Sequence, residues 1–194
     1  MLPARATEAW ITFHYAAVVS ADRSRAAELH RILAEARYQI QKNWAKSGQA
    51  PIYGDGLMYD FAILSDGTIV RTRKRRQQLW HCHNTIGNSG SYSLHWMLGP
   101  GQDLTPEQRA ASFALADALR AESGIPRDHV VAHCEWPLDD GPPHVASTYR
   151  RQPGQSACPG ATLFAHVAAY RALPDPSPAG PLRFRITVPI ANVR

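Results

Sequence analysis

The sequence contains nine histidines and three cysteines, and imidazoles and thiolates are the side chains that bind zinc in most proteins. None of them shows the close pairing of ligands that a structural zinc finger requires. His14 and His133 each end a predicted strand, where side chains of an α/β sheet converge on a cleft, and Cys158 precedes the last predicted helix. Two imidazoles and one thiolate would suit a catalytic zinc ion with one open position. A lone histidine is more often a packed or surface residue, and spacing alone does not decide between these interpretations.

Five segments are predicted to form strands, because aromatic and β-branched residues dominate them or because apolar and polar residues alternate. In the second of these segments the alternation places Tyr59 and Phe61 on the same face. Asp66-Gly67 then predicts a hairpin turn. The predicted strands are residues 10–15, 57–64, 68–71, 91–98 and 129–133.

Three segments are predicted to form helices. Residues 20–46 carry apolar side chains at spacings of three and four, which is typical of an amphipathic helix. A second helix begins after Thr105 as its cap, with Gln108 placed to close a capping box, and it ends at Gly124. A last helix ends before Pro174. Strands and helices in this order predict an α/β fold with a mixed central β-sheet flanked by helices.

Composition limits the class of protein. With 194 residues, 44% of them hydrophobic, the chain can bury one sizeable core. Three scattered cysteines are too few for a disulfide framework. The net charge is +5, and much of it lies in the run Arg71–Arg76, which suits a polyanion or simply a solvated loop. The run lacks the interleaved aromatic residues of a nucleic-acid site, so we expect no specific nucleic-acid partner.

Four short segments occur in an order that resembles a known family. They are residues 12–17 (TFHYAA), 58–69 (MYDFAILSDGTI), 132–135 (AHCE) and 157–160 (ACPG). The same order occurs in the type 2 N-acetylmuramoyl-L-alanine amidases, which include T7-like phage lysozymes and animal peptidoglycan recognition proteins. The similarity spans residues 8 to 173, and four motifs in the same order make chance agreement improbable. It implies the amidase and recognition-protein fold over a domain of residues 1–173.

The resemblance implies a ligand set and a set of roles. His14, His133 and Cys158 match the three zinc ligands of the family, so Zn²⁺ is the expected cofactor. Tyr59 matches a tyrosine that lies beside the attacking water, and we expect it to orient or deprotonate that water. The alternative for Tyr59 is a tyrosine packed in the core of its strand. Glu135 is expected to have a structural role, because the resemblance places the tyrosine at the water.

The resemblance also points to residues that contact the substrate. His81 matches a histidine that lines the substrate groove, and Asn88 falls near a family asparagine in the same loop. Phage members have a lysine two residues before the cysteine ligand, whereas this chain has Ser156. Catalytic recognition proteins often have threonine there. We therefore expect the Ser156 hydroxyl to donate to the oxyanion of the tetrahedral intermediate.

The activity implied is zinc-dependent hydrolysis of the amide bond between N-acetylmuramic acid and L-alanine in peptidoglycan. The partner is then peptidoglycan or a muropeptide, bound by a monomer. The alternative is a non-catalytic peptidoglycan-binding module, because members of the recognition branch that lack the cysteine ligand bind without hydrolysis. Cys158 is present, which favours the enzyme.

The two ends of the sequence carry further expectations. The first eight residues lack an apolar segment of secretory length, so we expect synthesis in the cytoplasm without a signal peptide. The protein would then reach the wall after release, as holin-released phage lysins do. Residues 174–181 are predicted to be a Pro-rich linker, and residues 182–194 resemble a strand at the start of an SH3-type wall-binding module.

Overall fold

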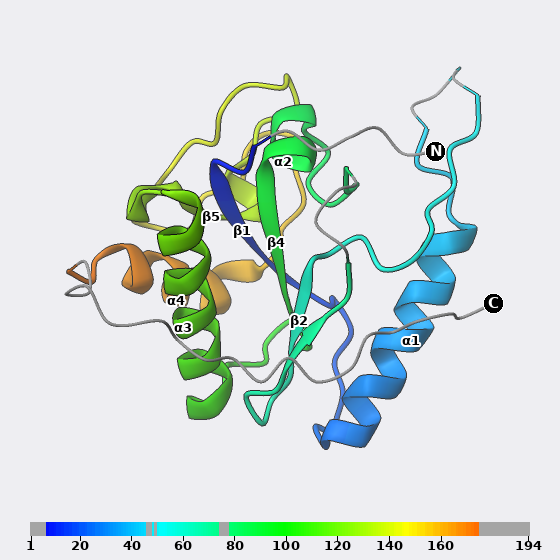
Figure 1. The fold of residues 1–194 in the computed structure, drawn as a ribbon, viewed down its shortest axis with the longest axis horizontal. Coiled ribbons are helices and arrows are strands. Elements are labelled where there is room, and N and C mark those ends of the chain that lie inside the picture. Colours follow the sequence, from blue (N-terminus) through cyan, green and yellow to red (C-terminus); the bar gives the residue numbers. More distant parts are fainter. Residues whose placement is uncertain (1–6, 46–47, 49, 74–77, 175–194) are drawn as a thin grey trace.

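A five-stranded mixed sheet forms the centre of the protein in the computed structural model, which describes residues 7–45, 48, 50–73 and 78–174. The strand order is β3-β2-β4-β1-β5. β1 pairs in parallel with β4 and β5, β2 pairs in parallel with β4, and β3 is antiparallel to β2 (Figure 1). The bounds are β1 Trp10–Tyr15, β2 Phe61–Ile63, β3 Ile69–Arg71, β4 Ser91–Trp96 and β5 Val130–Ala132. The α/β fold with a mixed sheet, predicted from the sequence, is confirmed.

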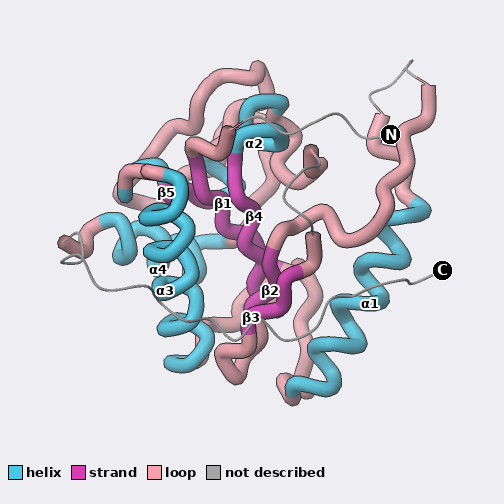
Figure 2. Tube along the Cα trace, viewed as in Figure 1, coloured by secondary structure: helices cyan, strands magenta, loops and turns pink. Residues whose placement is uncertain are grey.

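Helices cover both faces of this sheet. α3 (Pro106–Ser123) and α4 (Gly160–Arg171) lie on one side, and α1 (Arg25–Gln41) lies on the other, as Figures 1 and 2 show. A short helix α2 (Thr85–Gly90) leads into β4. Two 3₁₀ turns flank β5, namely η1 (Arg127–His129) and η2 (His133–Glu135). None of the described helices is long and apolar enough to cross a membrane.

The two faces of the sheet differ in polarity because strand side chains alternate. Phe13 of β1 and Leu94 of β4 point into the apolar core under α3 and α4. Their neighbours His14 and His95 therefore point to the opposite face, and the two histidines pair in register. α1 covers part of that second face, because its Ile32 packs against the apolar cluster there. Both histidines are buried, so the second face holds polar groups that need partners or a function.

The predicted bounds of α3, from the cap at Thr105 to Gly124, are confirmed. The Thr105 hydroxyl accepts the Gln108 N–H, and Gly124 ends the helix in a left-handed conformation with φ of 68°. The expected capping box does not close, because the Gln108 side-chain oxygen accepts from Arg23 at 3.2 Å, while its amide nitrogen donates to the carbonyl oxygen of Ile63 at 2.8 Å. That bond ties α3 to β2, so a tertiary contact replaces the local one.

Four of the five predicted strands are shorter than expected, and in two of them a buried carboxylate sets the boundary. Of residues 57–64, only Phe61–Ile63 is a strand, because Asp60 bends the chain and its carboxylate accepts the N–H of Ser93 at 2.9 Å. The strand predicted at 129–133 ends at Ala132, whose N–H donates to the Glu135 carboxylate at 2.7 Å. The start of β2 and the end of β5 are thus each set by a buried carboxylate that accepts a backbone N–H.

The predicted linker, apart from its first residue Pro174, and the whole predicted C-terminal strand of residues 182–194 lie outside the described residues. The expected domain of residues 1–173 contains every described helix and strand.

The cap of α3 gives a prediction of stability. Thr105→Ala removes the acceptor for the Gln108 N–H, so the free energy of unfolding should fall by about 1 kcal/mol. Denaturant unfolding followed by circular dichroism measures this. Thr105→Ser, which keeps the hydroxyl, is the control and should retain most of the stability; an equal loss in both variants would contradict the role of the cap.

Candidate metal centre

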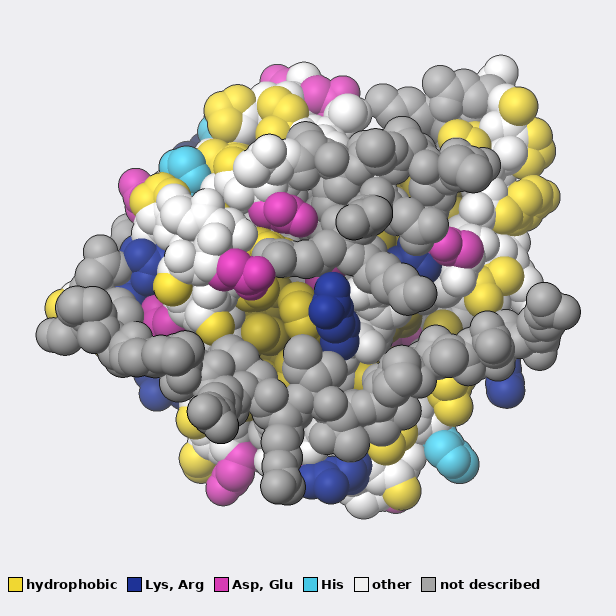
Figure 3. Space-filling model, viewed as in Figure 1, with side chains coloured by type: hydrophobic (Ala, Val, Ile, Leu, Met, Phe, Trp, Pro, Cys, Tyr) yellow, Lys and Arg dark blue, Asp and Glu magenta, His cyan; other side chains and the backbone are white. Residues whose placement is uncertain are grey.

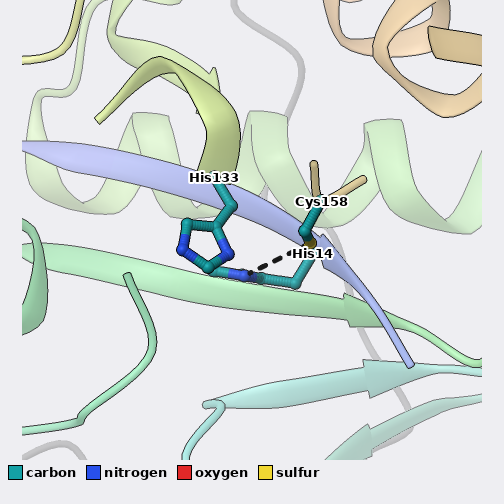
Figure 4. Close-up of side chains that lie close together, drawn as sticks. All are labelled: His14, His133 and Cys158. Atoms are coloured by element: carbon teal, nitrogen blue, oxygen red, sulfur yellow. Dashed lines mark hydrogen bonds between the residues drawn. The ribbon is translucent and has the colours of Figure 1, made fainter. Parts of the chain in front are cut away.

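Three metal-binding side chains from distant parts of the sequence meet on the polar face of the sheet. His14 comes from β1, His133 from η2 and Cys158 from the loop before α4. One donor atom of each lies within 4.8 Å of the others, and all three residues are buried. Figure 4 shows the three side chains pointing toward one another. The sequence analysis expected these three residues to meet, and the structure brings them together.

A chain of hydrogen bonds sets the orientation of His14. The carbonyl oxygen of Gly87 can only accept, so it accepts from Nε2 of His81 at 3.1 Å. In neutral His81, Nδ1 is then an acceptor, and it lies 2.9 Å from Nε2 of His14, which must donate to it. This leaves the Nδ1 lone pair of His14 directed at the Cys158 sulfur, 3.8 Å away, from which it can accept a hydrogen bond. A metal ligand held through its second ring nitrogen in this way is typical of zinc sites.

His133 offers a second lone pair. Its Nε2 is buried and has no hydrogen-bond partner in the described part of the chain. Burial lowers the pKa of His133 to about 3, and nearby His83 adds to this effect, so the ring is neutral at physiological pH. Burial likewise lowers the pKa of His14. An orphaned buried nitrogen is costly, and a metal ion would remove that cost.

Cys158 is held in place by its backbone. Its N–H donates to the Ser156 hydroxyl at 3.1 Å, and its carbonyl oxygen accepts the Cys134 N–H at 2.8 Å. Its sulfur lies 3.3 Å from the N–H of Tyr15, which stabilises a thiolate. Burial raises the pKa of the Cys158 thiol, so the thiolate needs a nearby positive charge. A divalent cation supplies that charge, and two imidazoles with one thiolate suit zinc.

Tyr59 lies directly beside the donors. Its ring is 5.0 Å from the His14 ring and stacks on the His95 ring at 4.1 Å. Because β2 begins only at Phe61, Tyr59 lies in a bend before the strand and is half-buried. Burial also raises the pKa of the Tyr59 phenol, so its hydroxyl keeps the proton and can donate it in a hydrogen bond.

The remaining expected residues lie around these three donors. Ser156 uses its oxygen to accept the Cys158 N–H, and its hydroxyl proton remains available to donate. The Asn88 side chain is buried and accepts the N–H groups of His81 and Cys82 at 2.8 and 3.0 Å. His81 is itself only 4% exposed. Both residues were expected to line the substrate groove: His81 instead lies in a buried layer that orients His14, whereas Asn88 supports that layer and also lines a pocket.

Glu135 has structural partners. Besides the Ala132 N–H, its carboxylate accepts the Ala146 N–H at 2.8 Å and pairs with Arg171 at 2.8 Å. It is fully buried, and these contacts join β5 to the following loop and to α4. This agrees with the structural role expected from the sequence.

A pocket of about 240 Å³ is connected to the three donors through His83. The imidazole of His83 lines it and lies nearly parallel to the His133 ring, with the ring centres 6.2 Å apart. His83 adopts a φ of 56°, a conformation rare for a residue other than glycine, and such strain is common at functional sites. His83 has no sequence signal that distinguishes it from a solvated or packed histidine, so only the structure identifies it. The pocket is lined by Lys42, Asn43, Trp44, Ala45, Trp80, His83, Thr85 and Asn88.

Comparisons with known proteins agree on the fold. A family model described as N-acetylmuramoyl-L-alanine amidase matches residues 6–161. No curated protein matches the sequence. Among solved structures, Drosophila peptidoglycan recognition protein SD is 13% identical with a TM-score of 0.61, covering 92% of this chain and 88% of that one.

Two further structures are similar. The N-acetylmuramoyl-L-alanine amidase LysC from Clostridium intestinale URNW is 20% identical with a TM-score of 0.51, and 84% of each chain is covered. Peptidoglycan recognition protein LE, solved in complex with tracheal cytotoxin, is 17% identical with a TM-score of 0.58, covering 87% of this chain and 81% of that one. At these identities the likeness is one of fold.

The hydrogen-bond chain through His81 gives a prediction of metal affinity. His81→Leu removes the acceptor for His14 Nε2, so the affinity for Zn²⁺ should fall about 10- to 100-fold. Competition with a chromogenic chelator measures this. His166→Leu on α4, which removes an imidazole that pairs with Asp103 and is not one of the three donors, is the control. Equal affinity in the wild type and His81→Leu would show that His81 does not orient the ligand.

Proposed function

Because the chain belongs to the N-acetylmuramoyl-L-alanine amidase family, we propose that it hydrolyses the amide bond between N-acetylmuramic acid and L-alanine in peptidoglycan, with a zinc ion held by His14, His133 and Cys158. One observation carries the proposal. Three buried donors from separate segments lie within 4.8 Å of one another; Nδ1 of His14 faces the Cys158 sulfur, and Nε2 of His133 has no hydrogen-bond partner in the described part of the chain. The donor set of two nitrogens and one sulfur supports zinc over a hard cation.

A bound zinc ion would supply Lewis-acid chemistry, lowering the pKa of water and polarising the scissile carbonyl. The chain supplies the remaining groups. The Tyr59 hydroxyl, beside His14, orients the attacking water through a hydrogen bond. The Ser156 hydroxyl, two residues from the cysteine ligand, donates to the oxygen on which negative charge develops. The buried position of the donors excludes bulk water, which strengthens both hydrogen bonds.

The substrate approaches along the pocket beside His83 in this proposal. Its aromatic and polar lining, which includes Trp44 and Trp80, suits a group that is partly apolar and partly hydrogen-bonding. Figure 3 shows acidic and basic side chains interspersed over the described part of one face, which does not favour a nucleic acid there. The proposed site of action is therefore the cell wall, reached after release from the cytoplasm.

Metal removal tests the proposal directly. We expect the purified protein to clear a suspension of peptidoglycan and to release new N-terminal L-alanine. A chelator should abolish both signals, and added Zn²⁺ should restore them, because the proposed Lewis acid is the ion held by the three donors. Cys158→Ser and His14→Ala should lose zinc and activity together. Binding to peptidoglycan with zinc present but without new N-terminal alanine would establish a recognition module in place of the enzyme.

Tyr59 is tested by removing one atom. Tyr59→Phe keeps the ring that packs between His14 and His95, so the zinc content should be unchanged. Loss of the hydroxyl should lower kcat about 10²- to 10⁴-fold, the range of general acid–base groups. Tyr38→Phe, which alters an exposed tyrosine on α1, is the matched control and should retain full activity. Full activity in Tyr59→Phe would reject the catalytic role.

A further inference from the structure

His95 lies beside the metal centre without belonging to it. It occupies β4 in register with His14 of β1, on the same face of the sheet, and it is 1% exposed. Its ring lies face to face with the Tyr59 ring, with 4.1 Å between the centres and 7° between the planes. The group of candidate metal ligands consists of His14, His133 and Cys158 and does not include His95.

Glu35 of α1 holds the His95 ring in this orientation. Nε2 of His95 lies 2.9 Å from the Glu35 carboxylate, and the nitrogen donates because a carboxylate can only accept. The Glu35 side chain is 19% exposed, so the bond is well shielded from water. The angle of the imidazole plane is thus set from outside the sheet, by a helix that covers this face.

Tyr59 depends on its ring contacts for orientation. It lies in the bend before β2, and its phenol oxygen makes no hydrogen bond to another residue in the described part of the chain. Its backbone is held, because the Tyr59 carbonyl oxygen accepts from the Thr72 hydroxyl. The side chain contacts the His95 ring, the His14 ring at 5.0 Å between centres, and the apolar cluster that contains Ile32. Because the His95 ring lies flat against the phenol ring, it limits how the phenol ring can tilt and therefore where the hydroxyl points.

We propose that Glu35 and His95 form a positioning pair, which holds the Tyr59 ring so that its hydroxyl points at the reacting water. The inference rests on the proposed function and adds two residues that act through Tyr59. The two rings stack face to face, so no hydrogen bond joins them, and no proton passes along the pair. Glu35 and His95 supply orientation alone, in the way that supporting residues keep an active-site group within about 0.5 Å of its productive place.

A histidine at position 95, where an apolar ring would also fit, indicates that this side chain orients Tyr59 and does more than fill space. Nδ1 of His95 is buried and has no hydrogen-bond partner among the described residues. An orphaned buried nitrogen costs free energy, and phenylalanine would fill the same flat space without that cost. Phenylalanine, however, could not bond to Glu35 and would be free to tilt. The hydrogen bond to α1 is what the imidazole adds.

The ring of Tyr59 reports on the pair directly, whether or not the protein is active. In spectra of protein labelled on tyrosine rings, the Tyr59 signals, assigned by their loss in Tyr59→Phe, should be shifted by the stacked imidazole. In His95→Ala and Glu35→Leu they should move toward exposed-tyrosine values. In Glu35→Gln, whose amide oxygen still accepts from Nε2, they should stay near the wild-type positions. Unchanged Tyr59 signals in His95→Ala and Glu35→Leu would overturn the proposal.

Kinetics then separate positioning from a structural role. His95→Phe and Glu35→Leu should each lower kcat about tenfold at unchanged KM and zinc content, since small misplacements cost up to about 10²-fold. In the Tyr59→Phe background the same changes should cost nothing more, because the hydroxyl they orient is gone. His166→Phe breaks a similar histidine–carboxylate pair with Asp103 and is the control.

Additive losses in the double variants, or a parallel loss of zinc, would overturn the positioning role and assign the pair to the metal centre or to folding. Failure of the wild-type protein to hydrolyse peptidoglycan would overturn the proposed function, and the catalytic part of this inference with it. The Tyr59 signals would still decide, in that case, whether Glu35 and His95 hold the ring.

Discussion

The site depends on one hydrogen bond, from Nε2 of His14 to Nδ1 of His81. A free imidazole could present either nitrogen to a metal ion, but this bond leaves Nδ1 as the donor that faces Cys158. His81 can accept it because its own Nε2 donates to the Gly87 carbonyl oxygen. The Asn88 side chain secures the same loop by accepting the His81 N–H. The Gly87 carbonyl oxygen thus determines, through His81, which nitrogen of His14 carries the lone pair that faces Cys158.

The two faces of the sheet have different roles, and this difference offsets the free-energy cost of burying the polar groups of the site. One face is apolar and packs against α3 and α4, which provides most of the hydrophobic stabilisation. The other face carries His14 and His95 next to each other, and neither has an apolar role. Polar groups buried in this way must find partners, so loops and α1 supply them. The division follows from alternation along β1 and β4, and it requires no special backbone geometry.

The proposed chemistry depends on the late start of β2. The Asp60 carboxylate accepts the Ser93 N–H just before the strand begins, and Tyr59 lies in the preceding bend, beside His14. The stacked His95 ring, tied to Glu35, then limits how Tyr59 can turn. A longer strand would have kept Tyr59 in the regular alternation with Phe61, facing the apolar core. The interruption of the strand is therefore part of the site.

The sequence by itself determined what depends on near neighbours or on short motifs. The ends of α3 at Thr105 and Gly124, the mixed α/β fold and the family resemblance that singled out the three donors all came from local pattern. Only the tertiary structure decided which nitrogen of His14 is free, that Gln108 bonds across to β2, and that His95 and Glu35 pair across 60 residues. The physical reason is that a hydrogen bond depends on the distance and direction between two atoms, and the order of residues along the chain states neither.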